Sequence, residues 1–316
     1  MKPLIVLGIN NVIYFSFLFM FLGVMMPFSA VGETPVGTQL TFGDENKFGT
    51  DWSPDGKWIA YSANESAFTE KYGIFIIPSE GGTPINLSQG ISYHCFSPCF
   101  TADSQEVTFS SHGVDGNNDC KIMSINIFTK ETRLIMPQEA IPQGINAFWS
   151  HNGQYLVYKK FPTAETMVYD TKKDESLNIA DGDSTSYGGS CFSPDNETVI
   201  STLEGTPYGY SGRQLFSIPR KADKKGTTQR MVNTTGSDPE EYPDYSPDGQ
   251  WLMYTLGRIP KLYVLKISTG EFMPVFDQDS VVRFSSFSPD CKEFCYLRLM
   301  KGVWQLFKTN FVEPGP

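Results

Sequence analysis

Short apolar runs rich in Val, Ile, Tyr, Phe and Thr alternate with clusters of Gly, Pro, Asn and Asp from about residue 40 onward. Strands that bury one face alternate apolar and polar residues with a period of two, and turn-forming residues mark their ends. Helical periodicity is scarce over the same region. The pattern predicts an all-β fold.

One segment recurs six times along the chain. It consists of an aromatic residue, a turn of the Ser-Pro-Asp-Gly type and an alternating apolar run, as in DWSPDGKWIAY from Asp51. Pro presets φ for such a turn, Asp hydrogen-bonds the local backbone, and Gly accepts a positive φ. The turns are expected near residues 53–56, 101–104, 150–153, 193–196, 246–249 and 288–291.

The aromatic residue shared by the copies sets the period of the repeat. Its spacing of 42 to 53 residues is typical of four-stranded propeller blades. The sequence therefore predicts a six-bladed β-propeller of four-stranded antiparallel blades. We expect the shared aromatic side chains to pack between neighbouring blades, and they are Trp52, Phe100, Trp149, Phe192, Tyr245 and Phe287.

The sixth copy lacks a fourth strand. Only residues 308–316 follow its third strand, and they contain two prolines and a glycine. Residues 38–42 have the fourth-strand pattern but precede the first copy. We expect this N-terminal strand to complete blade six, which closes the ring and removes an open sheet edge.

The first 32 residues differ from the rest. Lys2 precedes an almost uncharged apolar tract, and the small residues Ala30 and Gly32 follow it. This pattern is typical of a secretory signal, with the propeller in residues 33–316. The alternative is an uncleaved membrane anchor, because residues 3–28 could span a bilayer of roughly 30 Å. Both interpretations predict export, to the periplasm or the extracellular space.

Charge argues against one class of partner. The formal net charge is -10, and the 25 Lys and Arg residues form no basic stripe. Such a chain would be repelled by a phosphate backbone, so we expect no nucleic-acid partner. Membrane contact is expected only through the N-terminal segment, if that segment is retained.

The Ser-Pro-Asp-Gly turns and the Leu40-Thr41 ending resemble the PD-type, WD-like repeats of the TolB family over about residues 37–310. The resemblance implies a propeller that binds proteins, as TolB binds a peptidoglycan-associated lipoprotein in the Tol-Pal envelope system. It covers the propeller only, because about five residues separate Gly32 from the first predicted strand. The repeat also resembles the propellers of prolyl-oligopeptidase relatives and oligogalacturonate lyases.

Residues that would indicate a catalytic centre are few. A serine hydrolase needs a G-x-S-x-G elbow, and the segment Gly188–Phe192 lacks its last glycine. His94, His112 and His151 show no metal-binding spacing. We therefore expect a binding protein rather than an enzyme, without a cofactor.

One loop carries a weak metal signal. Asp115, Asn117 and Asp119 are rich in oxygen ligands, as in a calcium loop. The spaced glutamate of an EF-hand is missing, so a polar connection between two strands is the simpler interpretation. Calcium remains the alternative.

The longest connection, in blade four, contains Tyr208 and Tyr210 and ends near Arg213. Tyr and Arg are enriched at interfaces, although a glycine-rich loop without a role would look the same. Acidic residues stand in the connections before blades four and five, and they are Asp181, Asp183, Asp238, Glu240 and Glu241.

Such connections usually share one face of a propeller. The favoured hypothesis is a loop face and channel mouth that bind a protein, a peptide or a cell-envelope component. One alternative is a carbohydrate-active lyase or hydrolase that uses Asp181 and Asp183. The other is a structural envelope protein held by its uncleaved N-terminus.

The six cysteines permit fifteen disulfide pairings in an exported protein, and the sequence does not choose among them. Cys99 and Cys191 occupy the same position of the repeat, in blades two and four. An intervening blade places them too far apart for a disulfide. We expect both to be buried free thiols.

Overall fold

The computed structural model describes residues 37–66, 71–91, 93–113, 120–136, 144–180, 188–204, 212–221, 228–231, 238–276 and 280–313. The chain divides into two units, Met1–Pro35 and Val36–Pro316. The predicted signal or anchor, residues 1–32, lies outside the described residues. Every regular element in the described part is a β-strand, and no helix there is long and apolar enough to cross a membrane.

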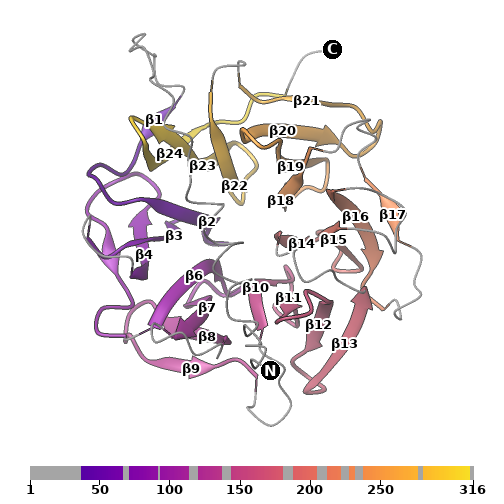
Figure 1. The fold of residues 1–316 in the computed structure, drawn as a ribbon, viewed down its shortest axis with the longest axis horizontal. Helices are drawn as coiled ribbons and strands as arrows, with labels where there is room; N and C mark the ends of the chain where they lie inside the picture. The colour runs from indigo at the N-terminus through magenta and orange to yellow at the C-terminus, as the bar shows by residue number, and fades with distance from the viewer. Residues whose placement is uncertain are drawn as a thin grey trace, which may run out of the picture. The chain divides into compact units, whose positions relative to one another are not determined.

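Six four-stranded antiparallel sheets form the blades of a propeller, which confirms the predicted fold (Figure 1). Blade one contains β2 (Lys47–Trp52), β3 (Trp58–Asn64), β4 (Tyr72–Pro78) and β5 (Ile85–Asn86). Blade two contains β6 (Tyr93–Phe100), β7 (Glu106–Gly113), β8 (Lys121–Asn126) and β9 (Thr132–Leu134). Blade three contains β10 (Gly144–Trp149), β11 (Tyr155–Lys160), β12 (Thr166–Asp170) and β13 (Glu175–Ala180).

The remaining three blades follow in chain order around the ring. Blade four contains β14 (Ser190–Phe192), β15 (Thr198–Glu204), β16 (Arg213–Pro219) and β17 (Gln229–Arg230). Blade five contains β18 (Glu240–Tyr245), β19 (Trp251–Leu256), β20 (Lys261–Lys266) and β21 (Phe272–Pro274). Blade six contains β22 (Val282–Phe287), β23 (Glu293–Met300), β24 (Val303–Asn310) and β1 (Thr38–Gln39).

Each copy of the repeat forms a tight turn between the first two strands of its blade. In blade one the Gly56 N–H donates to the Ser53 carbonyl at 2.9 Å, and the Trp58 N–H donates to Ser53 Oγ at 2.9 Å. The fourth residue of the turn has a positive φ in all six blades, and these residues are Gly56, Ser104, Gly153, Asn196, Gly249 and Cys291. The six predicted turns are therefore present.

The N-terminal strand closes the ring, as predicted. β1 pairs antiparallel with β24, and the Leu40 N–H donates to the Leu306 carbonyl at 2.8 Å. Beyond β1, Thr41 Oγ1 accepts the Leu306 N–H and donates to Gln305 Oε1. The two ends of the propeller unit are thus joined in one sheet.

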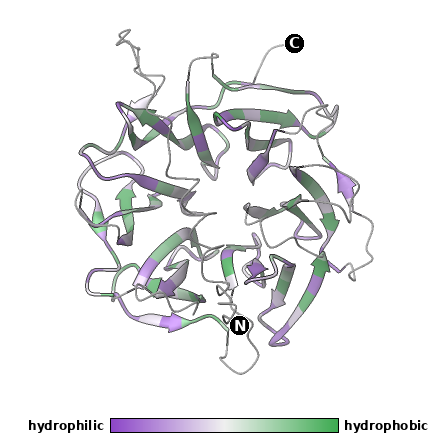
Figure 2. Ribbon diagram, viewed as in Figure 1, coloured by the Kyte–Doolittle hydropathy of each residue, from purple (hydrophilic) through white to green (hydrophobic). Residues whose placement is uncertain are grey.

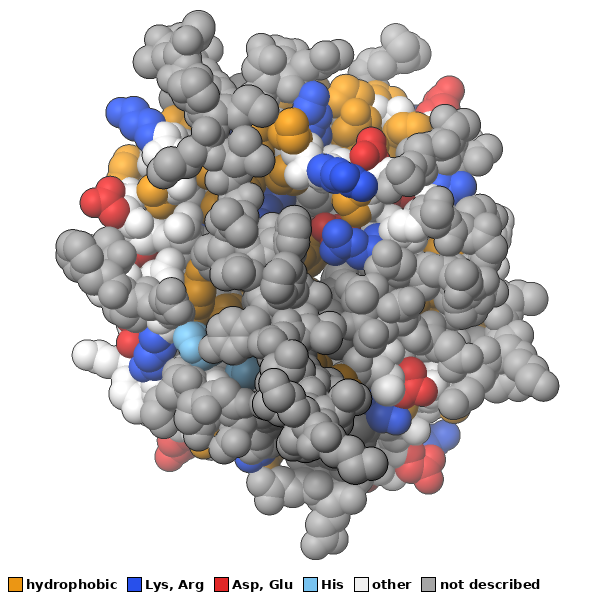
Figure 3. All heavy atoms as spheres, in the orientation of Figure 1, with side chains coloured by type: hydrophobic (Ala, Val, Ile, Leu, Met, Phe, Trp, Pro, Cys, Tyr) orange, Lys and Arg blue, Asp and Glu red, His pale blue; other side chains and the backbone are white. Residues whose placement is uncertain are grey.

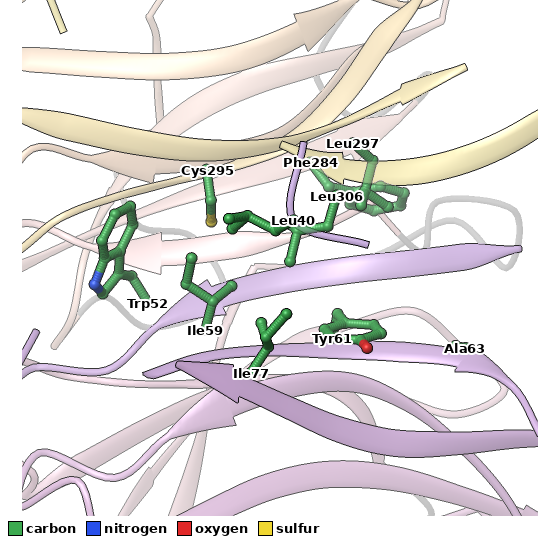
Figure 4. Close-up of a cluster of buried hydrophobic side chains, with 10 residues drawn as sticks. All are labelled: Leu40, Trp52, Ile59, Tyr61, Ala63, Ile77, Phe284, Cys295, Leu297 and Leu306. Atoms are coloured by element: carbon green, nitrogen blue, oxygen red, sulfur yellow. The ribbon is translucent and has the colours of Figure 1, made fainter. Parts of the chain in front are cut away.

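One cluster of buried side chains fills the space between each pair of neighbouring blades. Figure 4 shows the cluster between blades six and one, where Leu40 points toward Ile59 and Ile77. Each of the six shared aromatic residues belongs to such a cluster or packs against it, as expected. The outermost strands β9 and β17 are hydrophilic (Figure 2).

Candidate functional site

Strand direction sorts the connections onto two faces. The repeat turns and the links between third and fourth strands lie at one face, and the other connections lie at the opposite face. We call this second face the loop face. The strands that flank the connections predicted to bind a partner or calcium end there. The following residues of those connections lie outside the described residues: Tyr208, Tyr210, Asp181, Asp183, Asp115, Asn117 and Asp119.

Three predicted residues lie in the joint between blades four and five. Arg213 at the start of β16 forms an ion pair with Glu241. Glu240 is fully buried, accepts the Leu215 N–H at 3.0 Å, and lies 3.8 Å from an Arg230 nitrogen. Glu240 and Glu241 are the first two residues of β18. The sequence interpretation placed them in the connection before this strand and was wrong on that point. Glu240 and Glu241 thus fasten one blade to the next.

The six innermost strands surround a small cavity that is partly open to solvent. The residue three positions before the shared aromatic lines this cavity in every blade, and these residues are Gly49, Ser97, Asn146, Gly189, Tyr242 and Phe284. All except Gly189 have a positive φ, and a break in strand register accompanies each of those five. A β-bulge of this kind bends the strand and turns a side chain toward a new direction. The bulges thus form one level of the channel wall.

Two of these bulge positions hold large aromatic residues. Tyr242 has a φ of 54° and Phe284 a φ of 51°. Bulky residues avoid this region, and such strain collects at functional sites. Their ring centroids lie 4.1 Å apart. The strained backbone therefore brings two rings together at the channel wall.

A second level of the channel is formed by the residue directly before the shared aromatic. In five blades its side chain accepts the backbone N–H of the next blade's shared aromatic. The shortest of these bonds run from the Phe100 N–H to Asp51 Oδ2, at 2.6 Å, and from the Phe287 N–H to Asp244 Oδ2, at 2.8 Å. The other acceptors are Ser286 for Trp52, Cys99 for Trp149 and Cys191 for Tyr245.

Blade three is the exception to this ring of acceptors. Phe148 stands at the equivalent position and its side chain cannot accept a hydrogen bond. His151 in the following turn donates to the backbone carbonyl of Phe192, so it does not replace the missing acceptor. Sequence reasoning missed this ring, although the five acceptors are all polar or sulfur-containing residues at one repeat position.

Burial changes the protonation of the groups in this ring. Burial raises the pKa of Asp51 to about 7 and that of Asp244 well above its ordinary value, and the charge of Asp51 adds to the second shift. Both carboxyls line the cavity. Perturbed carboxyls in a cleft mark candidate functional sites. At neutral pH the channel can therefore carry less negative charge than its sequence suggests.

The cysteines behave as expected. No disulfide joins any of the six, and Cys99 and Cys191 are buried thiols. Burial raises the pKa of both thiols well above the ordinary value, which keeps them protonated and unreactive. No group of three His, Cys, Asp or Glu side chains in the described part of the chain is arranged to hold a metal ion.

Aromatic rings gather where the channel meets the loop face. Phe48 lies 4.6 Å from Phe284 and 6.3 Å from Phe96, measured between ring centroids. Phe96 in turn contacts Tyr72 at 5.0 Å and stacks on His94 at 5.8 Å. Figure 3 shows Lys and Arg side chains beside hydrophobic ones near the centre of the ring. We call the set formed by Phe48, Tyr72, His94, Phe96, Tyr242, Phe284, Arg283 and Trp304 the mouth cluster.

The fold is shared by proteins of solved structure. TolB from Acinetobacter baumannii superposes with a TM-score of 0.59 at 16% identity, over 86% of this chain and 65% of that one. A putative TolB from Agrobacterium tumefaciens gives 0.61 at 15% identity, over 86% and 93%. An oligogalacturonate lyase from Vibrio parahaemolyticus gives 0.57 at 14% identity, over 90% and 96%.

No protein-family model matches the chain, and no curated protein matches it in sequence. The chain spans 65% of the length of the Acinetobacter TolB. At these identities the likeness concerns the fold. Together with the six repeat turns and the closure by the N-terminal strand, it identifies residues 37–313 as a six-bladed propeller of the TolB-like fold.

Proposed function

We propose that the chain is an exported, non-enzymatic propeller that binds a protein, a peptide or a cell-envelope component at its loop face and channel mouth. The mouth cluster carries this proposal. Aromatic residues and Arg are the side chains that interfaces use as anchors. Here they converge from blades one, two, five and six on the open end of a channel.

The likeness to two TolB propellers supports the same proposal. TolB-type propellers bind a protein partner, as the sequence resemblance implied. The partner of this chain stays a proposal, and so does its location outside the cytoplasm. Mass spectrometry of the native protein tests export, because a cleaved signal leaves a chain that lacks residues 1–32.

A capture experiment tests binding at the loop face. The tagged full-length chain is incubated with an envelope extract, beside a variant that carries both Tyr208→Ser and Tyr210→Ser. We expect the variant to capture at least fivefold less of the partner at unchanged thermal stability. The matched control is Phe128→Ser, because Phe128 is 65% exposed in a turn on the opposite face. Equal capture by all three proteins would remove the blade-four loop from the interface.

A second candidate function is a carbohydrate-active lyase or hydrolase that uses Asp181 and Asp183. It is favoured by the superposition on an oligogalacturonate lyase over 90% of this chain. Purified protein incubated with polygalacturonate and with glycosides, with and without divalent metal, distinguishes the two functions. Unsaturated or shortened products that disappear in an Asp181→Asn/Asp183→Asn variant would establish the enzyme and overturn the binding proposal.

A further inference from the structure

One arginine of the mouth cluster is stacked on aromatic rings. The Arg283 guanidinium carbon, on β22, lies 4.0 Å from the Trp304 ring centroid. It lies 4.9 Å from the Phe284 centroid and 5.3 Å from that of Phe48. Guanidinium groups stack on aromatic faces, and three rings fix this one in direction. The side chain is therefore preorganised at the channel mouth.

Arg283 forms no ion pair with any described carboxylate, although the charge of Glu241 acts on it. Its Nε is buried and has no hydrogen-bond partner among the described residues. Glu241, the carboxylate whose charge acts on Arg283, forms an ion pair with Arg213. Burial lowers the pKa of Arg283 to about 10, so the group is still charged at neutral pH. A half-buried charge that lacks an ion-pair partner is costly, and a ligand that supplies the partner is favoured.

We propose that Arg283 is the receptor for a carboxylate of a peptide partner that enters the channel mouth. A planar guanidinium binds a carboxylate through two parallel hydrogen bonds. The rings around Arg283 offer apolar surface to the peptide residues on either side of the carboxylate. This fits a peptide in which an aromatic or aliphatic residue lies next to the acidic one. The inference rests on the proposed binding function and names the chemistry of its partner.

The test uses defined probes and the full-length chain. Calorimetry measures the binding of acetyl-Phe-Glu-amide, its glutamine counterpart acetyl-Phe-Gln-amide, and trigalacturonate. We expect the glutamate probe to bind at least tenfold more tightly than the glutamine probe. Arg283→Met keeps an apolar side chain on the rings and should lose this preference. Arg283→Lys keeps the charge without the planar fork and should retain part of it.

Arg258→Met is the matched control for long-range charge. Arg258 is exposed in the turn between β19 and β20, on the same loop face, and should leave the affinity unchanged. Equal binding of both dipeptides, no binding of either, or equal loss in Arg258→Met would overturn the carboxylate receptor. Binding of trigalacturonate alone would overturn the peptide and point to a sugar acid.

Failure of the inference and failure of the proposed function can be told apart. Envelope capture is repeated with Arg283→Met. A partner captured equally by the wild type and this variant would overturn the inference and leave the binding function standing. A wild type that captures nothing would overturn the binding function itself.

Discussion

At the residue scale, the repeat position before the shared aromatic is defined by what its side chain accepts rather than by its identity. Asp, Cys and Ser all receive the N–H of the next blade there. The sequence showed that Cys99 and Cys191 are equivalent, but the bond that makes them equivalent crosses between blades. A sequence pattern does not show which backbone N–H in the next blade a side chain will contact. This is why the ring of acceptors was not predicted.

Asp51 should make the protein less stable as pH rises toward neutrality. Its pKa is raised from 3.8 to about 7, so the folded chain holds this proton where the unfolded chain has lost it. The free energy of unfolding therefore falls between about pH 4 and pH 7 and stays low above that. Asp51→Asn keeps an acceptor for the Phe100 N–H. We expect roughly 2 to 4 kcal/mol of added stability at pH 8 and almost none at pH 4, in urea unfolding followed by fluorescence.

Asp195→Asn is the control of opposite sign. A hydrogen bond from Ser193 lowers the pKa of Asp195, so its carboxylate stabilises the fold above its unfolded pKa. This variant should lose stability at pH 7 and match the wild type well below pH 3. An Asp51→Asn protein less stable than the wild type at pH 8 would show that the charged carboxylate is needed in the ring.

At the scale of the strand and the turn, prediction succeeded where the chemistry is local. Pro, Asp and Gly give the repeat turn its geometry from within four residues, so all six turns could be predicted. The bulges could not, because Tyr242 and Phe284 are residues that avoid a positive φ. Packing from neighbouring blades imposes that conformation. The start of β18 was misplaced for a related reason, since buried glutamates look like a polar connection.

The sixth repeat turn can be improved by one substitution. Cys291 has a φ of 60° where three other copies have glycine. The left-handed conformation costs a residue with a Cβ about 1 to 2 kcal/mol. Glycine avoids this cost but loses more backbone entropy on folding, so the net gain is smaller. Cys291→Gly should therefore raise the free energy of unfolding by roughly 0.5 to 1 kcal/mol in urea titration. Gly249→Ala, the reverse change at a φ of 72°, should lower it by about 1 kcal/mol.

At the scale of the whole molecule, the repeat count, the blade architecture and the closing strand could all be predicted. The repeat count and the blade architecture depend on a pattern that occurs six times. The closing strand could be predicted because the sixth copy lacks a fourth strand. The channel mouth could not be predicted, because its rings come from blades one, two, five and six and no short segment contains them. Function in a propeller depends on that convergence, which arises only when the blades are folded into a ring.

The closure of blade six should govern the stability of the entire ring. Leu40 is 4% exposed and belongs to the core between blades six and one, on a segment joined to β24 by backbone hydrogen bonds. Leu40→Ala removes buried contacts there and should cost about 3 kcal/mol in the free energy of unfolding. Phe42→Ala is the control, because Phe42 is 72% exposed, and should change the free energy of unfolding by less than about 0.5 kcal/mol.

If closure couples the blades, Leu40→Ala will shift a single cooperative unfolding transition to lower urea concentration, as seen by both tryptophan fluorescence and circular dichroism. A separate early transition confined to blade six would instead show that the ring tolerates an open edge.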